Sequence, residues 1–204
     1  MPAPPQLILG SSSPRRRALL EGLGLELRIV PPSVDETPRP GEPAEAFVRR
    51  IAEEKLASVS ESVAASSNAV LLAADTVVAL GDTLLGKPSS EDDARRMLQT
   101  LAGRTHQVIT AVAGGCGGER RLVSVTTEVR FRPLTEHEID WYVATGEPLD
   151  KAGAYGVQGR GVWLVDRLDG SPSNVVGLPL GETVALLEAL GLPLPWRGPG
   201  EGPS

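Results

Sequence analysis

Residues 70–80 read VLLAADTVVAL, and this apolar stretch indicates the class of fold. Its length and composition predict a strand of the protein core, and the Gly81-Asp82 pair behind it favours a tight turn. One acidic residue, Asp75, interrupts the apolar run. A carboxylate in such surroundings costs free energy unless it is paired, hydrogen-bonded or bound to a metal. Asp75 is therefore a candidate functional residue, and a structural cap at a strand end is the alternative.

Segments with the patterns of strands and helices alternate before and after this stretch. Further strands are expected at residues 7–9, 25–30, 108–113, 122–131 and 162–168. Helices are expected from Pro14 onward and at residues 43–59, 89–102, 135–145 and 180–190. Serine or threonine caps and acidic first turns support two of these helices. This order predicts a mixed α/β fold with one sheet covered by helices.

The composition excludes several classes of protein. The 204 residues include 26 acidic and 20 basic side chains, and the net charge of −6 disfavours a general nucleic-acid binder. The single cysteine, Cys116, cannot form an intramolecular disulfide. Neither a membrane-spanning stretch nor an N-terminal signal sequence is visible. We therefore expect a cytoplasmic protein with no nucleic-acid or membrane partner.

The composition along the chain predicts one packed domain between two tails. The domain is expected over residues 7–192. A loose N-terminal tail is expected at residues 1–6, and a disordered Pro/Gly-rich tail at residues 193–204, because neither segment carries the apolar pattern of a core element.

The stretch SSSPRRR at residues 11–17 combines a helix start with unusual charge. Proline suits the first helical position, but three arginines beside the partly positive end of a helix dipole do not. An anion such as phosphate, bound by N–H groups and guanidinium groups, would remove this conflict. A solvated basic turn is the alternative.

Lys55 stands out when the helix expected around it is drawn as a wheel. It falls near the middle of an apolar stripe, whose members are Phe47, Val48, Ile51, Ala52 and Val59. An ammonium on a stripe that faces the core either reaches out to solvent along its methylene chain or binds an anion. The sequence leaves both readings open.

Three loops carry further polar residues. Lys87 follows Gly86 in a turn, Glu36 stands in an acidic loop after a strand, and residues 153–159 (GAYGVQG) allow the backbone to approach a ligand. Alone, the turn with Lys87 is uninformative, the acidic loop has the pattern of solvated surface, and the glycine loop lacks the spacing of a dinucleotide-binding fingerprint. Together with Arg15, Arg16, Lys55 and Asp75, they supply cations for a phosphate chain, carboxylates for a divalent metal and a base for water. Phosphoanhydride hydrolysis requires this set. The isolated His106 and His137 predict structural or surface roles.

Several of these stretches follow one another in an order known from one protein family. They are SSSPRR (11–16), Glu36, Glu54-Lys55, ADT (74–76), GKP (86–88), GRTH (103–106), KAGAYGVQG (151–159) and VGLP (176–179). On these motifs the chain resembles the Maf nucleotide pyrophosphatases over about residues 7–192. Two positions depart from the family pattern: Gly10 stands where alanine is usual, and Arg17 follows the arginine pair.

The resemblance implies an inosine-triphosphatase-like fold, with a long twisted mixed β-sheet flanked by helices around a central cleft. It also implies cleavage between the α and β phosphates of a nucleoside triphosphate, a divalent metal cation (Mg²⁺ or Mn²⁺) and a homodimer. Asp75 would be the proton acceptor, Glu36 would assist in catalysis, and both would hold the metal. The substrate-binding residues implied are Ser11, Arg15, Arg16, Lys55, Thr76, Lys87 and Gln158.

The motifs favour one branch of that family. The Asp75-Thr76 pair and the loop YGVQG at residues 155–159 are similar to the dTTP/UTP pyrophosphatases, in which Arg15, Thr76 and Gln158 would set base specificity. We therefore expect hydrolysis of dTTP and UTP, with modified pyrimidine nucleotides left open, as a house-cleaning activity on the nucleotide pool. The alternatives are a 7-methyl-GTP pyrophosphatase and a nucleotide-binding regulator of septum formation or cell division.

Overall fold

The computed structural model describes residues 5–63 and 68–197. Its strands are β1 (Gln6–Gly10), β2 (Leu27–Ile29), β3 (Ala69–Leu80), β4 (Thr83–Leu85), β5 (Thr105–Cys116), β6 (Glu119–Phe131) and β7 (Val165–Asp169). Its α-helices are α1 (Pro14–Glu21), α2 (Ala44–Ser62), α3 (Glu91–Leu101), α4 (Glu136–Val143), α5 (Pro172–Val176) and α6 (Leu180–Ala189). Short 3-10 helices are η1 (Glu147–Asp150), η2 (Ala152–Ala154) and η3 (Gly159–Leu164). Most of both expected tails, residues 1–4 and 198–204, lies outside the described residues.

The described strands form one mixed seven-stranded sheet. Their order is β2-β1-β3-β5-β6-β7, and β4 pairs with β3. β1 runs parallel to β2 and β3, and its pairing with β3 ends where Gly10 lies opposite Ala73. The antiparallel pairing of β3 with β4 begins at Val78. Asp75 and Thr76 therefore lie on β3 between its pairings with β1 and β4, and the predicted mixed α/β class is confirmed.

The chain divides into two compact units. The first comprises Met1–Asp75, Ala111–Ser124 and Gly177–Ser204, and the second comprises Thr76–Thr110 and Val125–Val176. Each of the long strands β3, β5 and β6 contributes residues to both units. Asp75 is the last residue of its segment in the first unit, and Thr76 begins the second unit.

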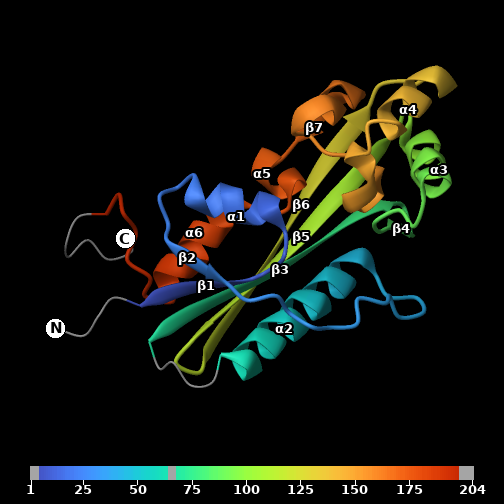
Figure 1. Ribbon diagram of the computed structural model, residues 1–204. Helices are drawn as coiled ribbons and strands as arrows, with labels where there is room; N and C mark the ends of the chain where they lie inside the picture. Colours follow the sequence, from blue (N-terminus) through green and yellow to red (C-terminus); the bar gives the residue numbers. More distant parts are fainter. Residues whose placement is uncertain (1–4, 64–67, 198–204) are drawn as a thin grey trace. The chain divides into compact units, whose positions relative to one another are not determined.

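In the first unit, helices pack on both faces of the strands. Leu7 and Leu9 of β1 belong to one apolar cluster with Leu187 of α6, whereas Ile8 packs with Val59 of α2. This alternation follows from the strand period of two, which points successive side chains to opposite faces. Figure 1 shows α2 on one face of β1 and α1 and α6 on the other.

The two departures from the family pattern have simple local explanations. A Cβ atom on Gly10 would lie 2.6 Å from Val59 Cγ2, so glycine at this position lets α2 approach β1 closely. Arg17, the additional arginine, forms an exposed ion pair of 2.7 Å with Glu21 one helical turn later. Such a surface pair contributes little to stability.

In the second unit, α3 and α4 contact each other and share a core with the strands. Val78 of β3, Phe131 of β6 and Leu98 of α3 are among its buried residues. α4 begins with a capping box, in which the Thr135 hydroxyl accepts from Glu138 N while the Glu138 carboxylate accepts from Thr135 N.

The structure differs from the expected elements near the C-terminal end. The strand expected at residues 162–168 begins only at Val165, because the glycine-rich segment before it forms η3. Past residue 192, Leu194 is buried in the core of the first unit. Among the described residues, no helix has both the length and the apolar character needed to span a membrane.

Candidate active site

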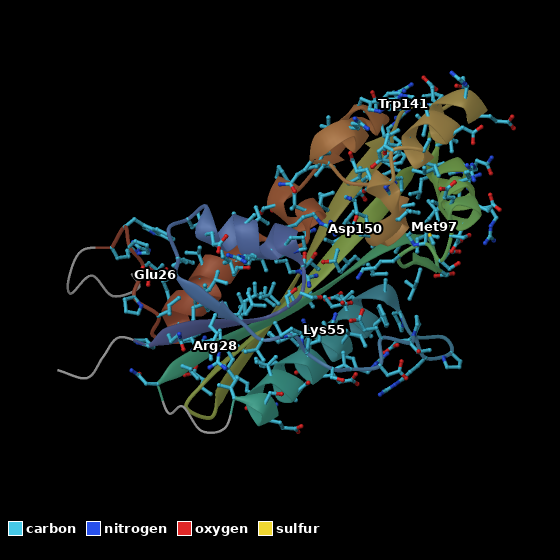
Figure 2. All side chains as sticks on the ribbon, in the orientation of Figure 1. Glu26, Arg28, Lys55, Met97, Trp141 and Asp150 are labelled. Atoms are coloured by element: carbon cyan, nitrogen blue, oxygen red, sulfur yellow. The ribbon has the colours of Figure 1, made fainter. Side chains whose placement is uncertain are left out.

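Asp75 and Lys55 form a buried ion pair. Lys55 Nζ donates a hydrogen bond of 2.7 Å to Asp75 Oδ1, and the two side chains are 8% exposed or less. As the wheel predicts, Lys55 lies among the buried residues of α2, on the side of the helix that faces the sheet (Figure 2). Removing two charges from water costs free energy that their attraction only partly returns. Such a pair is therefore more typical of a functional site than of a stabilising one.

A second carboxylate reaches the same ammonium. Glu36 Oε1 lies 2.7 Å from Lys55 Nζ, and the Glu36 side chain is 52% exposed. One ammonium therefore contacts two carboxylates, one buried and one open to solvent. The structure thus brings together three residues that the sequence analysis selected from separate segments: the loop at residues 30–43, α2 and β3.

The surroundings of Asp75 change its acidity. Burial raises the pKa of the Asp75 carboxyl above its ordinary value, although the charges of Lys55 and Arg16 act in the opposite direction. A carboxylate with a raised pKa is a stronger base, and general bases in enzymes are commonly adjusted in this way.

Arg16 connects the turn before α1 to other backbone segments of the first unit. Its Nε donates to Gly177 O at 2.7 Å, and its Nη1 donates to Ala74 O at 2.8 Å and to Ser11 Oγ at 3.3 Å. Ser13 caps α1 by accepting from Arg16 N at 3.4 Å. One of these acceptors, Ala74 O, belongs to the residue next to Asp75, and Ser11 is itself buried.

Charges in this part of the first unit partly balance one another. Burial lowers the pKa of Arg16, whereas Asp75 and Glu36 raise it. Arg15 is half-buried in the first turn of α1. Two cations, Arg16 and Lys55, therefore lie in the field of two carboxylates.

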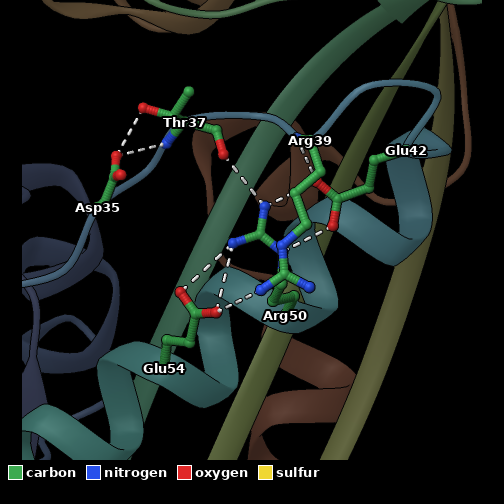
Figure 3. Close-up of polar contacts among 6 residues, drawn as sticks. All are labelled: Asp35, Thr37, Arg39, Glu42, Arg50 and Glu54. Carbon is green, nitrogen blue, oxygen red and sulfur yellow. Dashed lines mark hydrogen bonds and ion pairs between the residues drawn. The ribbon is translucent and has the colours of Figure 1, made fainter.

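Arg50 fastens the loop that carries Glu36 to α2 (Figure 3). Its Nε and Nη2 each donate to one carboxylate oxygen of Glu42 at 2.7 Å, and Nη2 also donates to Thr37 O at 3.2 Å. Nη1 contacts Glu54 at 3.3 Å. The hydrogen bonds from Arg50 lower the pKa of Glu42 to about 2. Because Thr37 follows Glu36 directly, this contact fixes the backbone beside the exposed carboxylate.

Sequence reasoning missed the pair of Arg50 and Glu42. Eight residues separate them, and no helical spacing indicates such a contact. The sequence shows only that Arg50 and Glu54 are four residues apart on one helix, a spacing that favours an ion pair.

Three other predicted site residues belong to the second unit. Thr76 is half-buried, and its Oγ1 lies 2.9 Å from Thr110 Oγ1. Lys87 and Gln158 are exposed. A hydrogen bond of 3.0 Å joins the turn at residues 86–88 to the loop at residues 153–159. Gly153 N donates it to Gly86 O.

Glu147 holds the loop that presents Gln158. Its carboxylate accepts from Arg160 N and Gly161 N at 2.9 Å each and from the Tyr142 hydroxyl at 3.0 Å. Burial acts to raise the pKa of Glu147, but these hydrogen bonds hold it below its ordinary value. Sequence reasoning missed Glu147 and Tyr142, because both stand outside the glycine loop that they support.

His106 has a structural position, as its isolation in the sequence predicts. Its Nε2 lies 2.8 Å from the Tyr155 hydroxyl, and its ring packs edge-on against Tyr155 and Phe131. Burial lowers the pKa of His106 to about 4. The ring is therefore neutral at physiological pH.

Carboxylates are the side chains here that could hold a metal ion. Asp75 and Glu36 both reach one point, occupied by Lys55 Nζ. Among residues 5–63 and 68–197, no group of three or more His, Cys, Asp or Glu side chains is placed to bind a metal. A metal at this site would therefore take its remaining ligands from substrate and water, as Mg²⁺ commonly does.

Comparison with known proteins places the chain among close relatives. A protein of Myxococcus xanthus named dTTP/UTP pyrophosphatase is 55% identical over 191 residues, which cover 94% of this chain and 95% of that protein. A protein of the same name from Anaeromyxobacter dehalogenans strain 2CP-1 is 54% identical over 96% of this chain and 99% of its own length.

A solved structure shares the fold at low sequence identity. The Ham1 protein of Staphylococcus aureus matches 90% of this chain and 98% of its own with a TM-score of 0.52 at 13% identity, and this likeness agrees with the fold that the sequence predicts. The family model described as Maf-like protein matches residues 6–190. The protein is therefore a member of the Maf-like family.

Proposed function

We propose that this protein hydrolyses the bond between the α and β phosphates of dTTP and UTP, releasing the nucleoside monophosphate and inorganic diphosphate. Relatives that share about half of its residues carry the name dTTP/UTP pyrophosphatase. The Asp75-Thr76 pair and the loop at residues 155–159 match that branch and not the 7-methyl-GTP branch. Modified pyrimidine nucleotides with the same hydrogen-bonding edge belong to the proposed substrate class.

The observation that carries the proposal is the cluster of Glu36, Lys55 and Asp75. In the proposed reaction Asp75 accepts the proton of the attacking water and the water oxygen bonds to the α phosphorus. The bond from that phosphorus to the bridging oxygen breaks, and the bridging oxygen leaves with the inorganic diphosphate. Burial raises the pKa of Asp75, which supports this role. Lys55 holds the Asp75 carboxylate in place through the 2.7 Å hydrogen bond.

Several cations would balance the charge of the triphosphate. Lys87, exposed in its turn, and Arg15, half-buried on α1, are proposed to bind phosphate oxygens directly. Arg16 binds two carbonyl oxygens, so we assign it mainly a contribution of charge. The Ser11 hydroxyl lies in the same turn and completes this set.

A divalent cation is part of this proposal. Asp75 and Glu36 both contact Lys55 Nζ, so an ion held by the two carboxylates would lie beside the ammonium, and phosphate oxygens and water would supply the other oxygen ligands that Mg²⁺ and Mn²⁺ favour. We propose that Asp75 and Glu36 would hold the ion. When bound, it neutralises phosphate charge and polarises the phosphoryl group. The homodimer and the cytoplasmic location expected from the sequence also remain proposals.

Product analysis of the purified protein tests the function. We would supply dTTP, UTP, CTP, GTP and 7-methyl-GTP in turn, with Mg²⁺, with Mn²⁺ and with neither, and measure monophosphate and diphosphate. The proposal expects both products from dTTP and UTP in the presence of a divalent ion. Preferential turnover of 7-methyl-GTP would assign the other branch. Nucleotide binding without diphosphate release would favour the regulatory role.

A further inference from the structure

A chain of buried hydroxyl groups leads from Thr76 into the interior of the second unit. Thr76 Oγ1 lies 2.9 Å from Thr110 Oγ1, and Thr110 Oγ1 donates to Asn174 O at 3.2 Å. Thr110 and Asn174 are fully buried, whereas Thr76 is half-buried. We call Thr76, Thr110 and the Asn174 carbonyl the hydroxyl chain.

The direction of the hydrogen bonds in this chain follows from counting protons. A threonine hydroxyl has one proton, and a carbonyl oxygen can only accept. The proton of Thr110 therefore goes to Asn174 O, and the proton between the two threonines must come from Thr76. The opposite direction would leave Thr110 Oγ1 and Asn174 O facing each other at 3.2 Å with no proton between them. Burying two acceptors in this way is costly.

Neighbouring residues fix the end of the hydroxyl chain. Asn174 Nδ2 donates to Val108 O and to Thr127 Oγ1, both at 2.9 Å. Thr127 Oγ1 also accepts from Ser171 N at 3.1 Å and donates its own proton to Ser171 O at 3.3 Å. Asn174 is thus bound to two strands, β5 and β6, and its carbonyl has little freedom to turn away from Thr110.

We propose that Thr110 is a positioning residue that makes Thr76 a hydrogen-bond acceptor toward the nucleotide base. This inference rests on the proposed function, in which Thr76 contacts a pyrimidine. Because its one proton is already given to Thr110, Thr76 offers other partners lone pairs only, whatever else it contacts. The ring of thymine or uracil carries an N3–H donor, whereas N3 of cytosine is an acceptor. The hydroxyl chain therefore selects for a base with an N–H group at this position.

This assignment also divides the task of base recognition between two residues. The amide of Gln158 carries both a donor and an acceptor, and it can turn over to suit either pyrimidine. Gln158 is exposed, and nothing in the described hydrogen bonds fixes its direction. Thr76 differs because a buried group sets its polarity. We therefore assign the discrimination between uracil and cytosine mainly to Thr76, with Thr110 acting through it.

Substitution of Thr110 by valine tests the assignment. Thr110→Val removes the acceptor of the Thr76 proton, so the Thr76 hydroxyl can rotate and donate to N3 of cytosine. We expect the ratio of kcat/KM for UTP to that for CTP to fall about tenfold, mainly through a gain on CTP. Thr110→Ser keeps the hydroxyl and should keep the wild-type ratio.

Thr127→Val is the matched control. It removes another fully buried hydroxyl from the same group of residues, but its proton goes to Ser171 O and not toward Thr76, and Asn174 keeps its hydrogen bond to Val108 O. Both valine variants should lose thermal stability, and only Thr110→Val should change the ratio. An unchanged ratio in Thr110→Val, or an equal change in Thr127→Val, would overturn the assignment.

Neutron diffraction from crystals exchanged into D₂O gives a second test that needs no variant. The assignment expects the Thr76 deuteron on the line to Thr110 Oγ1 and the Thr110 deuteron on the line to Asn174 O. A Thr110 deuteron directed at Thr76 would refute it. The proposed function fails separately, if the wild-type protein does not hydrolyse dTTP or UTP.

Discussion

The Asp75 carboxyl is buried on β3, and its hydrogen bond to Lys55 keeps it in a fixed orientation. We predict that Asp75→Asn lowers kcat for dTTP by about 10²–10⁴-fold, because an amide of the same shape cannot accept the proton of water. The fold should survive, since a neutral amide is easier to bury than a carboxylate. Steady-state kinetics and a thermal unfolding curve check both parts.

Asp82→Asn is the control for this change. Asp82 is exposed in the turn directly after the same strand, so the substitution removes an equal charge without touching the cluster. It should leave kcat unchanged. Activity of Asp75→Asn within twofold of the wild type would remove Asp75 from the proposed mechanism.

Lys55 is the ammonium partner of the buried carboxylate. Lys55→Met should lower the free energy of unfolding by roughly 3 kcal/mol at pH 8, because it leaves Asp75 buried without this charge partner. Without Lys55 the folded pKa of Asp75 rises further above its unfolded value. At pH values between the unfolded and the folded pKa of Asp75, the native protein then binds a proton that the unfolded chain does not. Stability therefore falls as pH rises through this interval.

The free energy of unfolding that Lys55→Met loses should accordingly be smaller at pH 5 than at pH 8. Urea unfolding at the two pH values measures it. In the double variant Lys55→Met/Asp75→Asn the part of the pH dependence that comes from Asp75 should disappear. An equal loss at both pH values would show that Lys55 stabilises the protein through its methylene groups and not through its charge.

At the scale of elements, the loop at residues 30–43 depends on α2 for its position. Arg50 binds Glu42 with two nitrogens and Thr37 O with one of them, which a single ammonium cannot reproduce. We predict that Arg50→Lys lowers kcat/KM for dTTP about tenfold and raises the Mg²⁺ concentration needed for half-maximal rate, because Glu36 loses its fixed backbone. Rates measured across a Mg²⁺ series check this.

Arg95→Lys is the matched control for Arg50→Lys. Arg50 contacts two carboxylates and Arg95 contacts three, those of Glu91, Asp92 and Asp140, but Arg95 lies on α3 in the second unit. Its replacement should change neither kcat/KM nor the Mg²⁺ dependence. If the two variants lose equal activity, a general effect of arginine loss explains the result better than the position of Glu36.

The elements show how far local sequence patterns determine structure. The apolar run at residues 70–80 predicts β3 through its length and composition. The stripe around Lys55 predicts the buried face of α2 because it has the period of a helix. The capping box of α4 is equally local. The contact of Arg50 with Glu42 is not, since it depends on how the intervening loop folds back.

The same distinction applies to the candidate site. The residue types of Asp75 and Lys55 are conspicuous because a charge in an apolar pattern needs an explanation. Thr110 gives no such signal, because threonine is common in strands and its partner Asn174 is 64 residues away. Motif resemblance supplied Thr76 and Gln158, and only the folded chain shows what surrounds them.

At the scale of the whole molecule, stability should depend on pH through His106. Its folded pKa of about 4 lies below the ordinary value of 6.5, so between these values the unfolded chain binds more protons than the native protein. Stability is therefore lost as pH falls through this window. Acidification from pH 7.5 to pH 4.5 should cost roughly 2–3 kcal/mol from this residue.

His106→Gln isolates that contribution. Glutamine keeps a hydrogen-bonding group near the Tyr155 hydroxyl but does not titrate. Urea unfolding at pH 7.5 and pH 4.5 measures the free energy of unfolding at each pH. Its decrease on acidification should be smaller in the variant than in the wild type. Identical losses would mean that carboxylates elsewhere account for the whole dependence on pH.

Thr110 is completely buried, yet in our assignment it directs a proton on a residue at the surface of the site. Selectivity could then diverge between relatives through one substitution in the protein interior, while every residue in contact with the nucleotide stays the same. Two proteins with identical pocket linings would accept different bases. To predict the substrate preference of a relative, its buried residues have to be compared as well as those that line the pocket.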